Sequence, residues 1–197
     1  MQPYLERVRM NSDEFIGVGQ GERNKEKLLP TGKLLLAVTS DSLYQQWNKQ
    51  HPKAYLSHFF CQIDNLFALK SAWDIGFYDP AANKITVFTP QQERGKETII
   101  IKPADDIFQK EPAAIEALQI DKVKVEMESA VNTVKRSLQN NFSQETLGDG
   151  FLILQAVQGQ TLWNFTFITR ALRFVNVKID AQSGEEFSHE QVNLVQK

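Results

Sequence analysis

The chain has 197 residues, of which 42% are hydrophobic, and its 22 Lys and Arg residues nearly balance 24 Asp and Glu residues. This length suits one domain of ordinary size or two small ones, and a net charge of −2 gives no overall field for nucleic acid or an anionic membrane. A single cysteine, Cys61, excludes an intrachain disulfide, and no apolar run approaches the roughly 20 residues needed to span a bilayer.

The N-terminal third of the chain begins without a regular pattern. Residues 1–33 are rich in glycine and charge and are interrupted by proline, so we expect an irregular lead-in. The short apolar run over 33–38 has the length of a strand. The stretch 39–50 predicts a helix, because Ser40 or Asp41 can cap it and its apolar residues fall on one helical face.

A group of strands follows this helix. Residues 55–63 are aromatic and β-prone, and residues 67–78 alternate between apolar and polar side chains. The turn-forming stretch 79–84 leads into short apolar runs at 85–88 and 98–103, with a polar loop between them. We therefore expect an antiparallel sheet built from consecutive strands.

The second half of the chain has a clearer pattern. Prolines punctuate residues 104–121, which we interpret as a linker. The apolar positions of 126–142 recur at i, i+3, i+4, i+7 and i+11 and predict an amphipathic helix. Three strand-like segments complete this half, at 151–157, 162–169 and 172–180.

Both halves place a helix before a meander of strands, which predicts an α+β fold of two tandem helix-on-antiparallel-sheet units. We place the first unit at 34–103 and the second at 122–190. Trp73 and Trp163 each begin an alternating run, and we expect both in the core because large aromatic side chains dominate cores. The order suggests an internal duplication whose register the sequence leaves open.

The last predicted strand runs into a turn with the sequence D-A-Q-S-G-E. Asp180 and Gly184 are turn-forming residues and are expected to shape it. With the preceding helix and strands, this turn resembles the PepSY module, whose last strand typically enters a D-A-x-x-G-[KE] turn. The resemblance is best over 122–187, and residues 34–103 are interpreted as a divergent second copy. It implies a cystatin-like α+β fold and brings no catalytic residues with it.

The resemblance also implies a compartment, because PepSY modules occur in exported and envelope proteins. We therefore expect a periplasmic or secreted protein from which a signal peptide has been removed. A cytoplasmic protein is the alternative, since the N-terminus has no apolar core of a signal peptide.

No catalytic or metal-binding set can be assembled from the sequence. The three histidines are His51, His58 and His189. His58 and Cys61 stand three residues apart, which on a strand puts them on opposite faces and prevents a Cys-His pair. We expect a protein that is not an enzyme and that binds no cofactor or metal.

The function expected is that of a non-catalytic module that binds a protein partner, with restraint of a protease as one role. Arg170 and Arg173 are the predicted recognition residues, and an exposed sheet edge can bind by strand addition. Two alternatives remain. One is a structural assembly domain, and the other is a carrier of a small molecule or lipid, in a pocket lined by Phe142, Phe151, Phe165, Phe167 and Phe174. No nucleic acid is expected, and the oligomeric state is left open.

Overall fold

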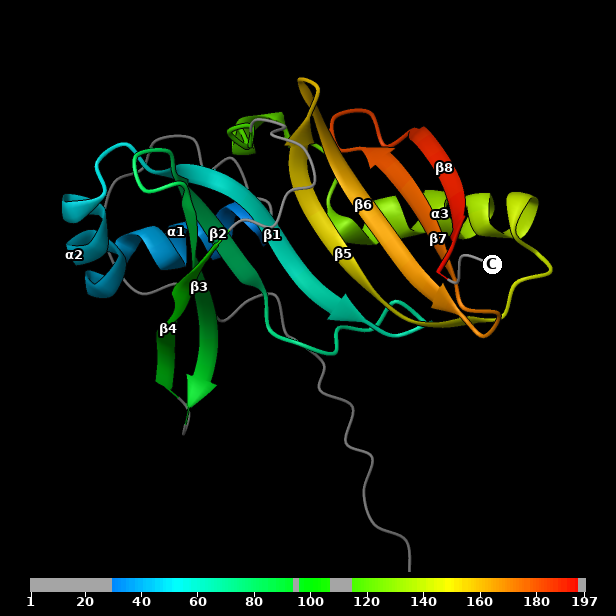
Figure 1. The fold of residues 1–197 in the computed structure, drawn as a ribbon, viewed down its shortest axis with the longest axis horizontal. Coiled ribbons are helices and arrows are strands. Elements are labelled where there is room, and N and C mark those ends of the chain that lie inside the picture. Colours follow the sequence, from blue (N-terminus) through cyan, green and yellow to red (C-terminus); the bar gives the residue numbers. More distant parts are fainter. Residues whose placement is uncertain (1–29, 94–95, 107–114, 195–197) are drawn as a thin grey trace, which may run out of the picture.

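A computed structural model of the chain describes residues 30–93, 96–106 and 115–194. Within these residues the fold consists of eight strands, three α-helices and one short 3₁₀-helix (Figure 1). The elements in chain order are α1 (Pro30–Ser40), α2 (Ser42–Gln50), β1 (Tyr55–Ile63), β2 (Asp74–Asp79), β3 (Lys84–Glu93), β4 (Lys96–Asp106), η1 (Ile120–Lys122), α3 (Met127–Asn141), β5 (Leu147–Val157), β6 (Gln160–Thr169), β7 (Arg173–Asp180) and β8 (Glu186–Asn193).

All eight strands belong to one antiparallel sheet in the order β4-β3-β2-β1-β5-β6-β7-β8. The prediction of two tandem helix-on-sheet units is therefore wrong. The reason is the pairing of β1 with β5, which runs from His58 opposite Gln155 to Ile63 opposite Gly150. Because these strands satisfy each other's backbone groups, the two meanders form one continuous α+β sheet.

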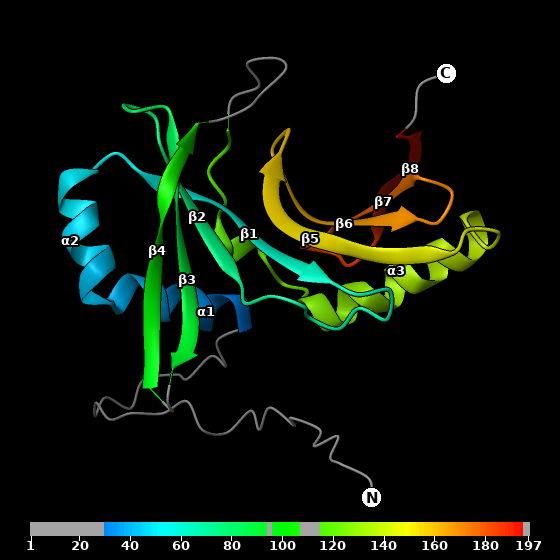
Figure 2. The same ribbon diagram turned by 60° about the horizontal axis from the view of Figure 1, so that its bottom comes forward.

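The three α-helices lie on one side of this sheet (Figure 2). Trp47 of α2 packs against Phe77 and Phe88, and the apolar stripe of α3 is buried over the other half of the sheet. A single apolar core runs beneath all three helices. Trp163 is fully buried there, as expected, and Trp73 is partly buried with its ring centroid 6.3 Å from that of Trp163.

The apolar run at 33–38 is helical, so the predicted strand is wrong. Leu34, Leu35 and Val38 fall at i, i+1 and i+4 and pack into the core, whereas Leu36 between them is 53% exposed. That spacing fits a helical face and not the period of a strand. Pro30 occupies the first position of α1, where a missing N–H costs least.

Several other elements are confirmed. Asp41 caps α2 by accepting a hydrogen bond of 2.8 Å from the Leu43 N–H, and α3 matches the predicted amphipathic helix. The strand predicted over 67–78 begins only at Asp74. The described residues of the predicted polar loop after residue 89 belong instead to the end of β3 and the start of β4. The strand β8 was not predicted.

Parts of the predicted lead-in and linker lie outside the described residues, namely 1–29 and 107–114. Of the remaining linker, β4 extends to Asp106 and η1 occupies Ile120–Lys122. Among the described helices, none combines the length and apolar character that a membrane span requires.

Candidate functional site

The face of the sheet opposite the helices carries apolar side chains at its centre. On β1, Phe59 and Cys61 are buried toward the helices, so the intervening Phe60 and the following Gln62 point the other way. The pairing of β1 with β5 sets Phe60 opposite Ile153 and Gln62 opposite Phe151. We call this side of the sheet, on which none of the described α-helices lies, the open face.

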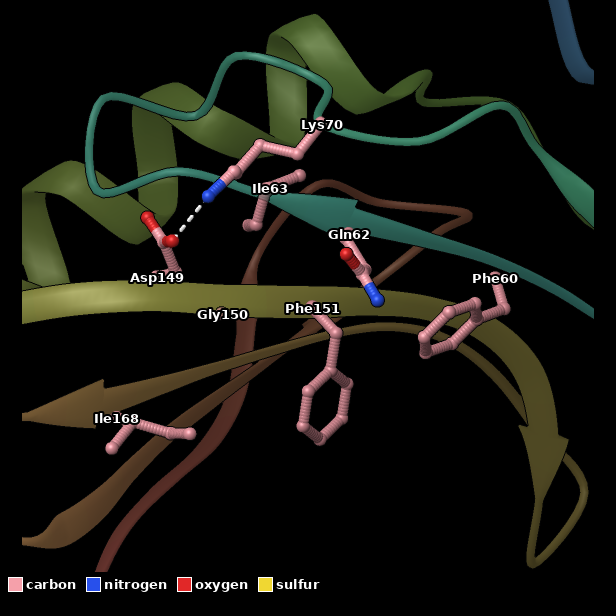
Figure 3. Close-up of a pocket in the computed structure, with 8 residues that line it drawn as sticks. All are labelled: Phe60, Gln62, Ile63, Lys70, Asp149, Gly150, Phe151 and Ile168. Atoms are coloured by element: carbon pink, nitrogen blue, oxygen red, sulfur yellow. Dashed lines mark hydrogen bonds and ion pairs between the residues drawn. The ribbon is translucent and has the colours of Figure 1, made fainter.

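A shallow hollow of about 220 Å³ lies at the middle of this sheet, where β1, β5 and β6 meet. The Phe60 and Phe151 rings stand 6.0 Å apart between centroids, and Ile168 of β6 is 41% exposed beside them (Figure 3). Its lining consists of Phe60, Gln62, Ile63, Lys70, Asp149, Gly150, Phe151 and Ile168. The hollow offers an apolar surface to a ligand.

One rim of the hollow is closed by an ion pair. Lys70, in the loop after β1, reaches the carboxylate of Asp149 at the start of β5 (Figure 3). Both side chains are largely exposed, so solvent screens their attraction and the pair contributes little to stability. The pair joins the loop after β1 to β5, beside the aromatic residues.

Gly150 allows β5 and β6 to approach each other beside the hollow. A Cβ atom at this position would lie 2.1 Å from the Thr166 carbonyl oxygen and 3.0 Å from the Phe167 ring. The register of β5 against β6 also shifts between Leu147 and Gly150, which marks a bulge. The shape of the hollow therefore depends on a residue without a side chain.

Two hydrogen-bonded groups flank the apolar centre of the open face. On one side, Asp74 accepts hydrogen bonds from Thr89 and Lys102. On the other, the Asn176 side-chain amide donates to the Asn164 carbonyl oxygen and, at 2.7 Å, to Thr166 Oγ1. The donors of both groups are engaged within the chain, whereas Asn176 Oδ1 is buried without a hydrogen-bond partner among the described residues.

Cys61 and His58 lie on opposite faces of β1, as the sequence predicts. Cys61 is fully buried, and burial raises the pKa of its thiol to about 12, which leaves it unreactive. Burial lowers the pKa of His58, whose ring lies on the opposite face. His51 Nδ1 lies 2.7 Å from Asp79 Oδ2, and His58 Nδ1 lies 2.9 Å from Oγ of the buried Ser57, which also donates to the Gly76 carbonyl. Among the described residues, no cluster of His, Cys, Asp and Glu could hold a metal ion.

The predicted recognition residues lie at the β6–β7 turn. Arg170 is exposed, and its backbone N–H donates to the Thr146 carbonyl. The Arg173 guanidinium pairs with Glu145 Oε1 at 3.0 Å, so part of its bonding capacity is used within the chain. Arg170 follows Ile168 by two residues along the chain.

The predicted turn residues lie at the β7–β8 turn. Asp180 Oδ1 accepts hydrogen bonds from the backbone N–H groups of Gln182 and Ser183 at 2.7 and 2.8 Å. Gly184 has φ +79°, a conformation that side chains rarely adopt. Its carbonyl accepts a hydrogen bond from Thr133 Oγ1, which ties the turn to α3.

Of the phenylalanines expected to line a pocket, only Phe151 lines the hollow. Phe165 and Phe167 are fully buried in the core, where they pack around Phe67. Sequence reasoning missed Phe60, Lys70, Asp149 and Ile168. The alternation within residues 55–63 could have indicated that Phe60 faces away from its neighbours Phe59 and Cys61.

The comparisons with known proteins do not identify a family. No protein-family model matches the chain, and no curated protein matches it. Among solved structures, a candidate lipoprotein from Clostridium difficile 630 superposes with a TM-score of 0.45 at 10% identity, over 76% of this chain and 90% of that protein. A likeness of this size carries no argument about function.

Proposed function

We propose that the chain is a non-catalytic module that binds a protein partner on the open face of its sheet. The observation that carries this proposal is the pair of aromatic rings, Phe60 and Phe151, which are partly exposed at the centre of the open face. Aromatic side chains at the centre of a contact supply most of the binding energy in protein interfaces.

The surroundings of these rings support a protein ligand over a small molecule. The hollow of about 220 Å³ is smaller than the roughly 300–1,000 Å³ of typical small-molecule pockets. It is large enough to receive one apolar side chain of a partner. Polar side chains flank the hollow, around Asp74 on one side and Asn176 on the other, as in the polar rim of a protein interface.

The finer parts of the proposal rest on the resemblance of residues 122–187 to the PepSY module. These finer parts are that the protein belongs to the envelope or secreted fraction and that its role is to restrain a protease. The D-A-Q-S-G-E turn at 180–185 supports them, because it carries the residues on which the resemblance depends. Arg170 and Arg173 remain predicted binding residues, at the turn that follows Ile168 along the chain.

Site-specific photo-crosslinking tests which face binds. A photoreactive phenylalanine analogue replaces Phe151 in one protein and Leu36 in another, and each is irradiated in an extract of the source organism. Leu36 is the matched control because it is 53% exposed on α1, on the helical side. We expect a discrete protein adduct from position 151 and none from position 36.

Affinity measurements with the crosslinked partner complete this test. We expect F151E to weaken binding at least tenfold and L36E to leave it unchanged, with thermal unfolding showing that both variants fold. Adducts of equal yield from both positions, or none from position 151, would contradict binding at the open face.

A further inference from the structure

The strand β4 forms one end of the sheet, and no described strand pairs with its outer edge. Together β3 and β4 form a ribbon that projects beyond the other strands (Figure 1), because β2 pairs with β3 only up to Phe88. An edge strand presents a row of unpaired backbone N–H and C=O groups, which can pair with another strand.

The middle of β4 is unusually suited to such pairing. It contains three consecutive isoleucines, of which Ile100 is 42% and Ile101 37% exposed. The pairing of β4 with β3 continues without a shift from Thr98 to Lys102, so this segment is regular. On the open face, the Lys102 ammonium group forms an ion pair with Asp74, away from the outer edge.

The opposite edge of the sheet is less suited to strand pairing. The register of β7 against β8 shifts between Lys178 and Ile179, which marks a bulge, and β8 has no consecutive apolar residues. A bulge is one of the features by which proteins prevent edge pairing. Residues 98–102 of β4 lack a bulge, and their one charged side chain, Lys102, is paired with Asp74.

We infer that two copies of this chain associate by antiparallel pairing of their β4 strands around a two-fold axis at Ile100. In this register Ile100 stands opposite Ile100 of the second copy. Ile99 stands opposite Ile101, and Thr98 stands opposite Lys102. Isoleucine therefore lies opposite isoleucine on both faces of the extended sheet. Such cross-strand pairs of β-branched side chains stabilise a sheet.

The three isoleucines select this register. Residues directly opposite each other share one face of a sheet, so the two-fold axis must pass through a residue and not between two. The axis at Ile100 sets each isoleucine opposite another isoleucine. An axis at Ile99 would set Ile100 opposite Thr98, and an axis at Ile101 would set Ile100 opposite Lys102.

A second copy is therefore the ligand that this edge fits best. A two-fold axis perpendicular to the sheet keeps both open faces on the same side, so the dimer would present two binding faces together. The inference is independent of the proposed function, because β4 lies at the end of the sheet and the hollow lies at its middle.

Sedimentation over a hundredfold range of micromolar concentration provides the first test. We expect a reversible monomer–dimer equilibrium that I100K shifts at least tenfold toward monomer. The matched control is V192K, because Val192 is 51% exposed on β8, at the opposite edge of the sheet. Thermal unfolding of both variants shows that they fold.

Cysteine cross-linking reads the register itself. Under mild oxidation we expect I100C to form a covalent dimer, whereas T98C alone and K102C alone remain monomeric and a mixture of the two forms a heterodimer. The native Cys61 does not interfere because it is buried. A chain that stays monomeric, a dimer that I100K leaves intact, or equal cross-linking of T98C alone would overturn the inference.

Discussion

At the scale of single residues, the contact of His51 with Asp79 joins the end of α2 to the end of β2. His51 is the C-cap of α2, its ring stacks on Trp47, and its Nδ1 lies 2.7 Å from Asp79 Oδ2. The hydrogen bond from His51, together with one from the Ala81 N–H, lowers the pKa of the buried Asp79 carboxyl. The folded state therefore favours the carboxylate.

This sign fixes the pH dependence of an Asp79→Asn variant. A lowered pKa in the folded state contributes stability above the unfolded pKa of about 4, and that stability is lost as the pH falls through the folded value. We expect D79N to lower the urea midpoint most near neutral pH and progressively less toward about pH 3. The control is D121N, at an exposed carboxylate of η1. A deficit that stays constant with pH would contradict the assignment.

At the scale of elements, Glu126 connects the starts of two helices. It is the N-cap residue of α3, but its carboxylate accepts a hydrogen bond of 2.6 Å from Thr31 Oγ1 at the start of α1. Burial raises the pKa of Glu126, and the hydrogen bonds from Thr31 offset only part of this effect. The folded state therefore favours the protonated carboxyl.

Because the pKa of Glu126 is raised on folding, protonation of its carboxyl stabilises the folded state. This stabilisation is complete below the pKa of the unfolded state and is lost as the pH rises through the pKa of the folded state. We expect E126Q, which keeps an acceptor for Thr31, to gain about 0.5 kcal/mol near neutral pH because the group is partly exposed. T31V removes the donor and should lose about 1 kcal/mol. Urea unfolding at several pH values measures both, and an E126Q variant as unstable as T31V would contradict this account.

The elements also show what the sequence can and cannot predict. The helix α3 was predictable because its apolar stripe repeats with the helical period over 15 residues. The run at 33–38 was too short to separate helix from strand, and only packing of Leu34, Leu35 and Val38 decides it. The strand β8 has no apolar alternation to detect, because nearly all of its side chains are exposed, and its place in the sheet comes from pairing with β7.

The candidate site was missed for a related reason. Phe60 and Phe151 lie about 90 positions apart in the sequence, and they meet because β1 pairs with β5 in one register. Local periodicity gives the face on which each side chain lies. It does not give which strands are neighbours, since that depends on contacts between distant segments.

At the scale of the whole molecule, the β1–β5 pairing makes one folding unit out of two similar runs of elements. The core continues across this pairing, since the Trp73 ring packs against Phe59 of β1 and Trp163 of β6. Neither half of the sheet can be removed without exposing a central strand and part of this shared core. We therefore expect one cooperative unfolding transition for residues on both sides.

The tryptophans allow this expectation to be measured. A variant with only Trp47 reports on α2 at one end of the molecule, and a variant with only Trp163 reports on β6 in the other half. In each variant we expect the fluorescence and far-UV circular dichroism midpoints in urea to coincide, because loss of either half breaks the β1–β5 pairing. If Trp47 fluorescence changed at a lower urea concentration than the circular dichroism of the same variant, the half containing β1 to β4 would unfold by itself. The continuous sheet would then not act as one unit.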